Sequence, residues 1–156
     1  GKSITLVVNI EDTAKSAAAS SIESQLEQAG LSVTVERLPW EEYTAALAAG
    51  NFDLYLAEVY LTADFDLSAL VSPTGSLNYG RWQDLAISAL LDRLRQAQDG
   101  MRQVAADGLS RYLVQCSPIA PICFKNGSVL TQYGRVEGVS PVQNNVFANL
   151  SGWTVT

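Results

Sequence analysis

Two short stretches near the middle of the chain combine aromatic rings with carboxylate, amide and guanidinium groups. They contain Tyr60, Thr62, Asp64 and Asp66, and then Asn78, Tyr79, Arg81 and Trp82. Aromatic surface with a few polar groups is typical of a pocket for a small molecule or a peptide. In such a pocket Asp64 or Asp66 would pair with an amine of the ligand, and Arg81 with a carboxylate.

The same residues also have a structural interpretation. An Asp in a loop before a helix is most often its N-cap, and we favour this role for Asp66. Arg81 and Trp82 would then only cover the rim of the domain. Ligand contacts are expected from Tyr60, Thr62, Asp64, Asn78, Tyr79 and Trp82.

The residues needed for most catalysis are missing. The 156 residues include no histidine, which removes the commonest general base, the Ser-His and Cys-His pairs and the usual zinc ligands. Glycine-rich phosphate loops and Ser-x-x-Lys motifs are absent as well. Asp64 and Asp66 have no third oxygen-rich partner at cation-binding spacing. We therefore expect no enzyme, no cofactor and no metal.

Length and charge narrow the class further. A chain of 156 residues fits one domain, and a net charge of −6 argues against nucleic acid as a partner. Its start, directly at a strand and without a signal segment, predicts an excised or processed fragment. Cys116 and Cys123 are separated by an apolar run with two prolines, so we expect free thiols.

The hydrophobic pattern predicts an α/β fold. Strands are expected at residues 4–10, 31–38 and 52–60, with helices at 13–29 and 40–49 between them. This alternation indicates βαβ crossovers and a mainly parallel sheet in which the first two strands are neighbours. The predicted core is Leu6, Val8, Val33, Val35, Leu54 and Leu56.

The second half is expected to be mostly helical. Two amphipathic helices are predicted at residues 83–98 and 101–115, with a break at Asp99-Gly100. The first would turn Leu85, Ala89, Leu90 and Leu94 inward. Strands are predicted at 119–124 and 128–133, joined by a hairpin-like break at 125–127, and the chain beyond Gly134 is expected to be loop-like.

Several short motifs follow one another in a particular order. They lie at residues 22–33, 40–43, 50–54, 64–66, 78–79, 90–91 and 117–122, followed by a thinner match at 136–138 and Trp153. In this order they resemble the second lobe of family-5 extracellular solute-binding proteins of ABC transporters, the oligopeptide, dipeptide and nickel type.

The resemblance implies a fold, a function and a location. The fold would be a type II periplasmic-binding-protein-like lobe at residues 4–124, a mainly parallel βαβαβ sheet flanked by helices, followed by a crossover and C-terminal tail at 125–156. A peptide or similar solute would be enclosed between this lobe and a first lobe and delivered to an ABC permease. The protein would be extracytoplasmic, in the periplasm or as a cell-surface lipoprotein. Missing histidine argues against a nickel-type site.

Two departures from the family and two alternatives stay open. Asp66-Leu67 stands where the family usually has Asp-Pro, and Asp64 is the nearest candidate for the acidic residue that meets a peptide's amino group. The fold would also suit the ligand-sensing domain of a regulator, which an upstream helix-turn-helix in place of a lipoprotein signal would reveal. An enzyme on a flavodoxin-like sheet is disfavoured by the missing phosphate loop and histidine.

The tail carries many apolar residues: Val129, Leu130, Val136, Val139, Val146, Phe147, Leu150 and Trp153. Each one left in water forgoes roughly 1.5 to 3 kcal/mol of burial. We therefore expect the tail to fold back on its lobe, adding residues 128–133 to the sheet, or to be covered by a second copy.

Overall fold

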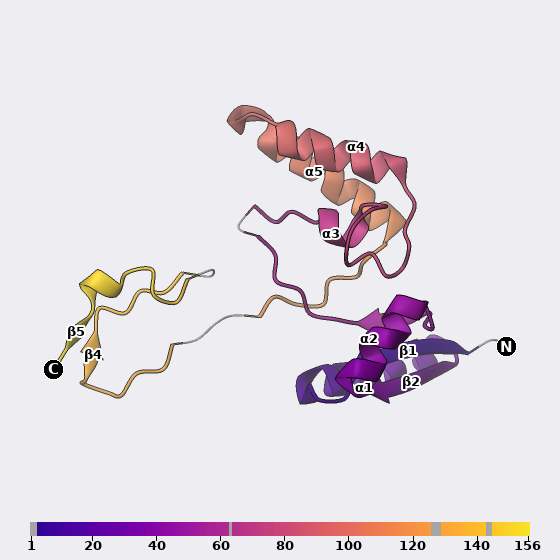
Figure 1. The fold of residues 1–156 in the computed structure, drawn as a ribbon, viewed down its shortest axis with the longest axis horizontal. Coiled ribbons are helices and arrows are strands. Elements are labelled where there is room, and N and C mark those ends of the chain that lie inside the picture. Colours follow the sequence, from indigo (N-terminus) through magenta and orange to yellow (C-terminus); the bar gives the residue numbers. More distant parts are fainter. Residues whose placement is uncertain (1–2, 63, 126–128, 143–144) are drawn as a thin grey trace. The chain divides into compact units, whose positions relative to one another are not determined.

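The computed structural model of the chain describes residues 3–62, 64–125, 129–142 and 145–156 (Figure 1). Within it the chain forms two compact units, Gly1–Pro118 and Ile119–Thr156. Each unit is described by itself.

The first unit begins with the predicted alternation of strands and helices. Its elements are β1 (Ile4–Asn9), α1 (Thr13–Gln28), β2 (Val33–Leu38), α2 (Trp40–Ala49) and β3 (Leu54–Leu56). The three strands form a parallel sheet in the order β2-β1-β3, in which Leu6 lies opposite Val35 of β2 and Leu54 of β3. The predicted α/β class and the pairing of the first two strands are confirmed.

β1 is the central strand and is covered on both faces, as its unbroken apolar run predicts. Leu6 and Val8 pack with Val33 and Ala19 on the α1 side. Val7 points to the other face, where it packs against Tyr43 and Leu47 of α2. The alternation of side chains along a strand therefore gives the sheet two apolar layers, one for each helix.

The predicted core needs one correction. Leu6, Val8 and Val33 are buried, and Val35 and Leu56 pack against them, but Leu54 is 42% exposed. Leu54 opens an edge strand of only three residues, much shorter than the predicted 52–60. Among the described residues, no further strand pairs with β3 on its far side.

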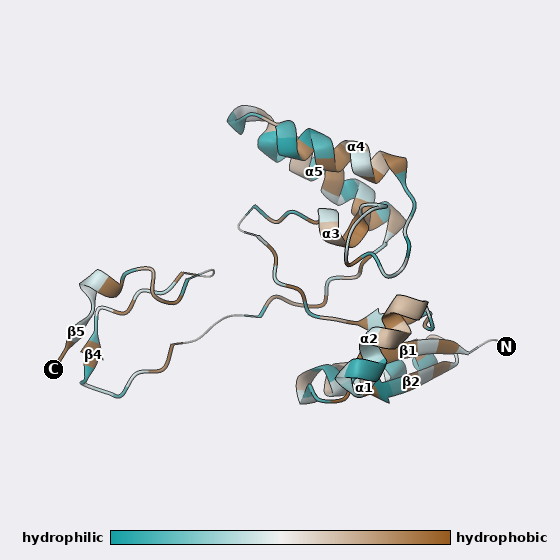
Figure 2. Ribbon diagram, in the orientation of Figure 1, coloured by the Kyte–Doolittle hydropathy of each residue, from teal (hydrophilic) through white to brown (hydrophobic). Residues whose placement is uncertain are grey.

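Helices dominate the rest of the first unit: α3 (Ser68–Val71), α4 (Leu85–Gln96) and α5 (Asp99–Cys116). Asp84 is the N-cap of α4, since its Oδ1 accepts hydrogen bonds from the N–H groups of Ala86 and Ile87 at 2.8 and 3.4 Å. Figure 2 shows apolar and polar stretches on both α4 and α5, as expected for amphipathic helices.

Two details of the helical prediction are wrong. Asp99 and Gly100 form the first turn of α5 and do not break the chain there, because an acidic residue suits a helix N-terminus. Leu85 is 85% exposed, whereas Ile87 and Leu91 are the buried residues of α4. Leu90 and Leu94 are half-buried, so the buried stripe runs through Ile87, Leu90, Leu91 and Leu94 and leaves Leu85 and Ala89 exposed.

The second unit has little regular structure in its described residues: β4 (Val136–Glu137), a 3-10 turn η1 (Leu150–Gly152) and β5 (Thr154–Val155). β4 and β5 pair antiparallel, with Val136 opposite Val155. The prediction that the chain is loop-like beyond Gly134 did not include these two strands.

The strands predicted near the start of this unit are wrong. Residues 119–124 and 129–133 form no strand, and the three-stranded sheet gains none from them. Pro118 and Pro121 have no N–H to donate to a neighbouring strand, which explains the first failure. Residues 126–128, which include most of the predicted break and Ser128, lie outside the described residues.

Cys116 and Cys123 are both free thiols, as predicted. Among the described residues, the structure has no helix that combines the length and the apolar character needed to cross a membrane.

Candidate functional site

The carboxyl end of the parallel sheet is the place where an α/β fold usually binds its ligand. β1 ends there at Asn9, whose Oδ1 accepts a hydrogen bond from the Glu11 N–H at 2.6 Å and fixes the turn into α1. Asp12 follows as the N-cap of α1 and accepts from the Lys15 N–H at 2.9 Å. The turn therefore places acidic side chains at the carboxyl end of the sheet.

Lys15 joins this turn to the segment that follows β3. Its ammonium lies 2.6 Å from Asp12 Oδ2 and 3.2 Å from Glu58 Oε2. The hydrogen bond with Asp12 raises the pKa of Lys15, burial opposes the rise, and Glu58 adds to it. No local pattern singles out Lys15 and Glu58, since they are 43 residues apart and the parallel pairing of β1 with β3 brings them together.

Beyond Glu58 lies the first predicted stretch. Tyr60 is 97% exposed, and Thr62 and Asp64 are also exposed. A hydrogen bond from the Thr62 side chain, the largest effect, and the backbone N–H of Asp64 lower the pKa of the Asp64 carboxyl, with a smaller contribution from Arg102. Asp64 is therefore ionised at neutral pH and available to a cationic group.

Thr62, Asp64, Phe65 and Asp66 form a tight turn, which we call the acidic turn. The Phe65 N–H donates to the Thr62 carbonyl oxygen at 2.9 Å, and the Asp66 N–H donates to Thr62 Oγ1 at 3.3 Å. Phe65 has a left-handed backbone, with φ 55°. This conformation costs a bulky residue about 1 to 2 kcal/mol.

Asp66 is not the N-cap of a helix in the predicted sense. Leu67 occupies the cap position of α3 and makes no side-chain capping hydrogen bond. Asp66 lies one residue before the cap position, and its Oδ1 accepts a hydrogen bond from the Ser68 N–H at 2.9 Å. Hydrogen bonds from the Ser68 side chain and backbone lower the pKa of Asp66. Its role at the start of α3 is structural, as expected, but its position is shifted.

The second predicted stretch is a loop that Asn78 closes. Asn78 Nδ2 donates to the carbonyl oxygens of Ser72 and Trp82, both at 2.9 Å, and Asn78 Oδ1 accepts from the Trp82 N–H at 2.8 Å. Most of the hydrogen-bonding capacity of this amide is thus used inside the loop. Asn78 positions Trp82, which is half-buried.

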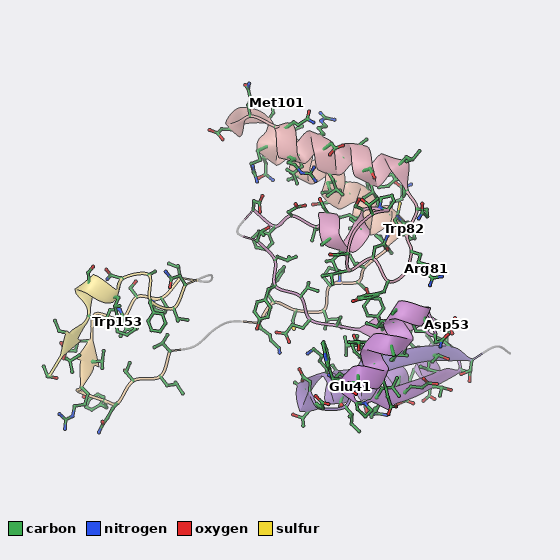
Figure 3. The ribbon with its side chains drawn as sticks, viewed as in Figure 1. Glu41, Asp53, Arg81, Trp82, Met101 and Trp153 are labelled. Carbon is green, nitrogen blue, oxygen red and sulfur yellow. The ribbon has the colours of Figure 1, made fainter. Side chains whose placement is uncertain are left out.

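Tyr79 and Arg81 attach this loop to the sheet and α2. The Tyr79 ring packs edge-on against Tyr55, with centroids 6.1 Å apart. Arg81 Nη2 lies 3.4 Å from the carbonyl oxygens of Ala48 and Ala49 at the end of α2, where Gly50 terminates the helix in the left-handed region. Figure 3 shows Arg81 and Trp82 on this loop. Arg81 thus stabilises a helix C-terminus, a structural role in line with the second interpretation above.

The six predicted contact residues therefore fall on two loops, Tyr60, Thr62 and Asp64 on one and Asn78, Tyr79 and Trp82 on the other. Their contact with a ligand stays a prediction. Within the described part of the chain, no three Cys, Asp or Glu side chains are grouped so that they could hold a metal ion.

Comparison with solved structures identifies the fold. An ABC transporter substrate-binding protein, CtaP from Listeria monocytogenes, matches 99% of this chain with a TM-score of 0.79 and 17% identity. The Bacillus subtilis oligopeptide-binding protein AppA, solved with a nonapeptide, also matches 99%, with a TM-score of 0.69 and 14% identity. The Escherichia coli murein tripeptide-binding protein MppA matches 77%, with a TM-score of 0.69 and 23% identity.

These matches confirm the predicted fold, that of one part of an ABC-transporter solute-binding protein. The chain spans 33% of the length of CtaP, 32% of AppA and 24% of MppA. No protein-family model matches the sequence. No curated protein matches it either.

Proposed function

We propose that the chain is the ligand-binding lobe of a solute receptor for an ABC importer, which binds an oligopeptide or a similar small solute and delivers it to a membrane permease. The observation that carries this proposal is the match of 99% of the chain to CtaP at a TM-score of 0.79. AppA, which shares the fold, was solved with a nonapeptide. A binding role without catalysis agrees with the absence of histidine.

In this proposal the solute is enclosed between this lobe and a first lobe of the same protein. The chain's share of a quarter to a third of the matched proteins leaves room for such a lobe. The receptor would work outside the cytoplasm, in the periplasm or as a lipoprotein at the cell surface.

The ligand contacts would come from the two loops described above, with Asp64 receiving the ligand's amino group. Its carboxylate is exposed, and its lowered pKa keeps it charged at neutral pH. Exposure also leaves it solvated, so a useful ion pair needs a cleft that closes over it and excludes water.

The test is a titration of the isotopically labelled 156-residue chain with trialanine, followed by NMR. We expect shifts at Tyr60, Thr62, Asp64, Asn78, Tyr79 and Trp82, with weak affinity on the order of millimolar, because a half-cleft loses about half of its contacts. Calorimetry at micromolar concentration should show no heat.

Asp64→Asn should abolish these shifts, while Asp107→Asn, an exposed acidic residue of α5, should leave them intact. Shifts confined to other surfaces would reject the assigned site. Submicromolar affinity of the isolated chain would contradict the proposal that half of the cleft is contributed elsewhere.

A further inference from the structure

We propose that Ser68 and Arg95 are positioning residues that hold the acidic turn, and with it the Asp64 carboxylate, through a series of hydrogen bonds beginning on α4. The inference rests on the proposed function in one respect, since Asp64 is the residue proposed to bind the ligand's amine. The series itself is a property of the ligand-free chain.

The first half of the series runs from α4 to Asp66. Arg95 Nη2 donates to Ser68 Oγ at 2.9 Å. The Ser68 hydroxyl in turn donates to Asp66 Oδ1, and the Ser68 N–H donates to the same oxygen at 2.9 Å. Arg95 therefore orients the hydroxyl that orients the Asp66 carboxylate.

The second half runs from Asp66 to Asp64. The Asp66 N–H donates to Thr62 Oγ1 at 3.3 Å. Thr62 is also the neighbour that lowers the pKa of the Asp64 carboxyl most. The Ser68 hydroxyl accepts one hydrogen bond, from Arg95, and donates another, to Asp66. In such a chain each bond polarises the next, so that loss of one weakens the others.

α4 is a firm origin for this series. Its Ile87 and Leu91 are buried, which fixes the helix in the first unit. Arg95 lies in its last turn, and Arg95 Nη1 pairs with Asp92 Oδ1 at 3.2 Å, so a second contact orients the guanidinium. Arg95 thus reaches Ser68 from a helix whose position the core determines.

The acidic turn needs such an anchor. Phe65 holds a left-handed backbone conformation, φ 55°, that bulky residues avoid. Strained conformations persist only where surrounding interactions over-determine them, and they cluster at functional sites. With Thr62 and Asp64 exposed, the bonds from Ser68 and Arg95 supply this restraint from outside the turn.

The test uses carboxyl and amide NMR of the ligand-free chain and three variants. In Ser68→Ala and Arg95→Met we expect the titration midpoints of Asp66 and Asp64 to shift upward and the amide order of Asp64, Phe65 and Asp66 to fall. Arg95→Lys should recover part of both effects, since it retains a charged donor.

Two controls separate positioning from charge and from unfolding. Arg93→Met removes a charge from the same turn of α4 and should leave both midpoints and the amides unchanged. The charge of Arg95 also lowers the pKa of Asp66, so the amide order of the acidic turn and the recovery in Arg95→Lys separate positioning from charge. Ser68→Thr keeps the hydroxyl and should behave like the parent chain. Unchanged midpoints and amides in Ser68→Ala and Arg95→Met, or equal effects of Arg93→Met and Arg95→Met, would overturn the proposal.

A final experiment, trialanine binding by the same variants, separates this inference from the proposed function. If the parent chain binds trialanine, Ser68→Ala and Arg95→Met should weaken binding by roughly threefold to tenfold, because preorganisation is lost. Unweakened binding in both variants would count against the positioning role. If the parent chain does not bind trialanine, peptide binding is rejected, while the carboxyl titrations still decide whether the series exists.

Discussion

The Lys15 ammonium lies 3.2 Å from a carboxylate oxygen of Glu58, which joins the first turn of α1 to the segment leading into the acidic turn. Asp12 holds the same ammonium from the other side at 2.6 Å. A ligand carboxylate at this edge would therefore compete with two carboxylates of the protein for Lys15. Lys15 is better suited to fixing the edge of the sheet than to attracting an anion.

Replacing Lys15 by Met should lower the free energy of unfolding by about 1 kcal/mol near neutral pH, the upper range for a partly exposed ion pair. The folded-state pKa of Lys15 is raised above its ordinary 10.5, so its stabilisation is complete below that value and is lost as the pH rises through the folded pKa. Urea unfolding of both chains at about pH 7 and at strongly alkaline pH measures this difference. A gap between them that stays constant with pH would contradict the assignment.

Tyr43→Phe should destabilise the first unit by about 1 kcal/mol, since it removes the hydrogen bond from the Tyr43 hydroxyl to the Leu56 carbonyl oxygen at 3.0 Å. Burial raises the pKa of Tyr43 to about 12, with smaller contributions from Tyr55 and Tyr79. Stability should therefore fall as the pH rises from 10 toward 12, because the unfolded chain ionises first. In an ultraviolet titration, the variant should show one tyrosine fewer among those that ionise at the highest pH. Tyr133→Phe, at a fully exposed tyrosine, is the matched control and should leave stability unchanged.

Two glycine substitutions should have opposite effects. A Cβ at Gly75 would lie 2.4 Å from the Ala69 carbonyl oxygen and 2.6 Å from that of Ser68, so Gly75→Ala should cost about 1 to 3 kcal/mol. A Cβ at Gly100 meets nothing within 4 Å, and Gly100→Ala in α5 should stabilise by about 0.5 to 1 kcal/mol. Thermal unfolding of both variants provides the comparison. Equal melting temperatures would show that the loop after α3 is not packed as described.

Local patterns were sufficient for much of the fold. The unbroken apolar run of β1 predicted a strand buried on both faces, and the helices predicted at 13–29 and 40–49 match α1 and α2 to within one residue. Leu85 shows the limit of periodicity, since it fits the apolar pattern of α4 and is 85% exposed, whereas Ile87 and Leu91 are buried.

The candidate site was harder to predict because its contacts join distant segments. Arg81 looked like a ligand contact or a rim residue, and its bonds to the end of α2 depend on a chain reversal that no local pattern encodes. Arg95 and Ser68 are 27 residues apart and drew no attention, since an Arg in a last helical turn is ordinary. Asn78 and Arg81 were named from the sequence, but the hydrogen bonds by which they fix the second loop were not predicted.

The tail gives the last prediction. Phe147 and Trp153 pack together with ring centroids 6.0 Å apart, and Trp153 is half-buried, yet Leu130 is 94% exposed, Phe147 59% and Leu150 57%. The prediction that this segment adds a strand to the sheet is wrong for residues 129–133. Burial free energy favours a cover for apolar side chains as exposed as these. We expect the 156-residue chain to self-associate as its concentration rises, and sedimentation velocity to show it.

Leu130→Ser combined with Leu150→Ser should reduce the association and leave the thermal unfolding of the first unit unchanged, because both residues belong to the second unit. A chain that stays monomeric to roughly millimolar concentration would refute the argument, since exposed patches of this kind normally mark an interaction surface.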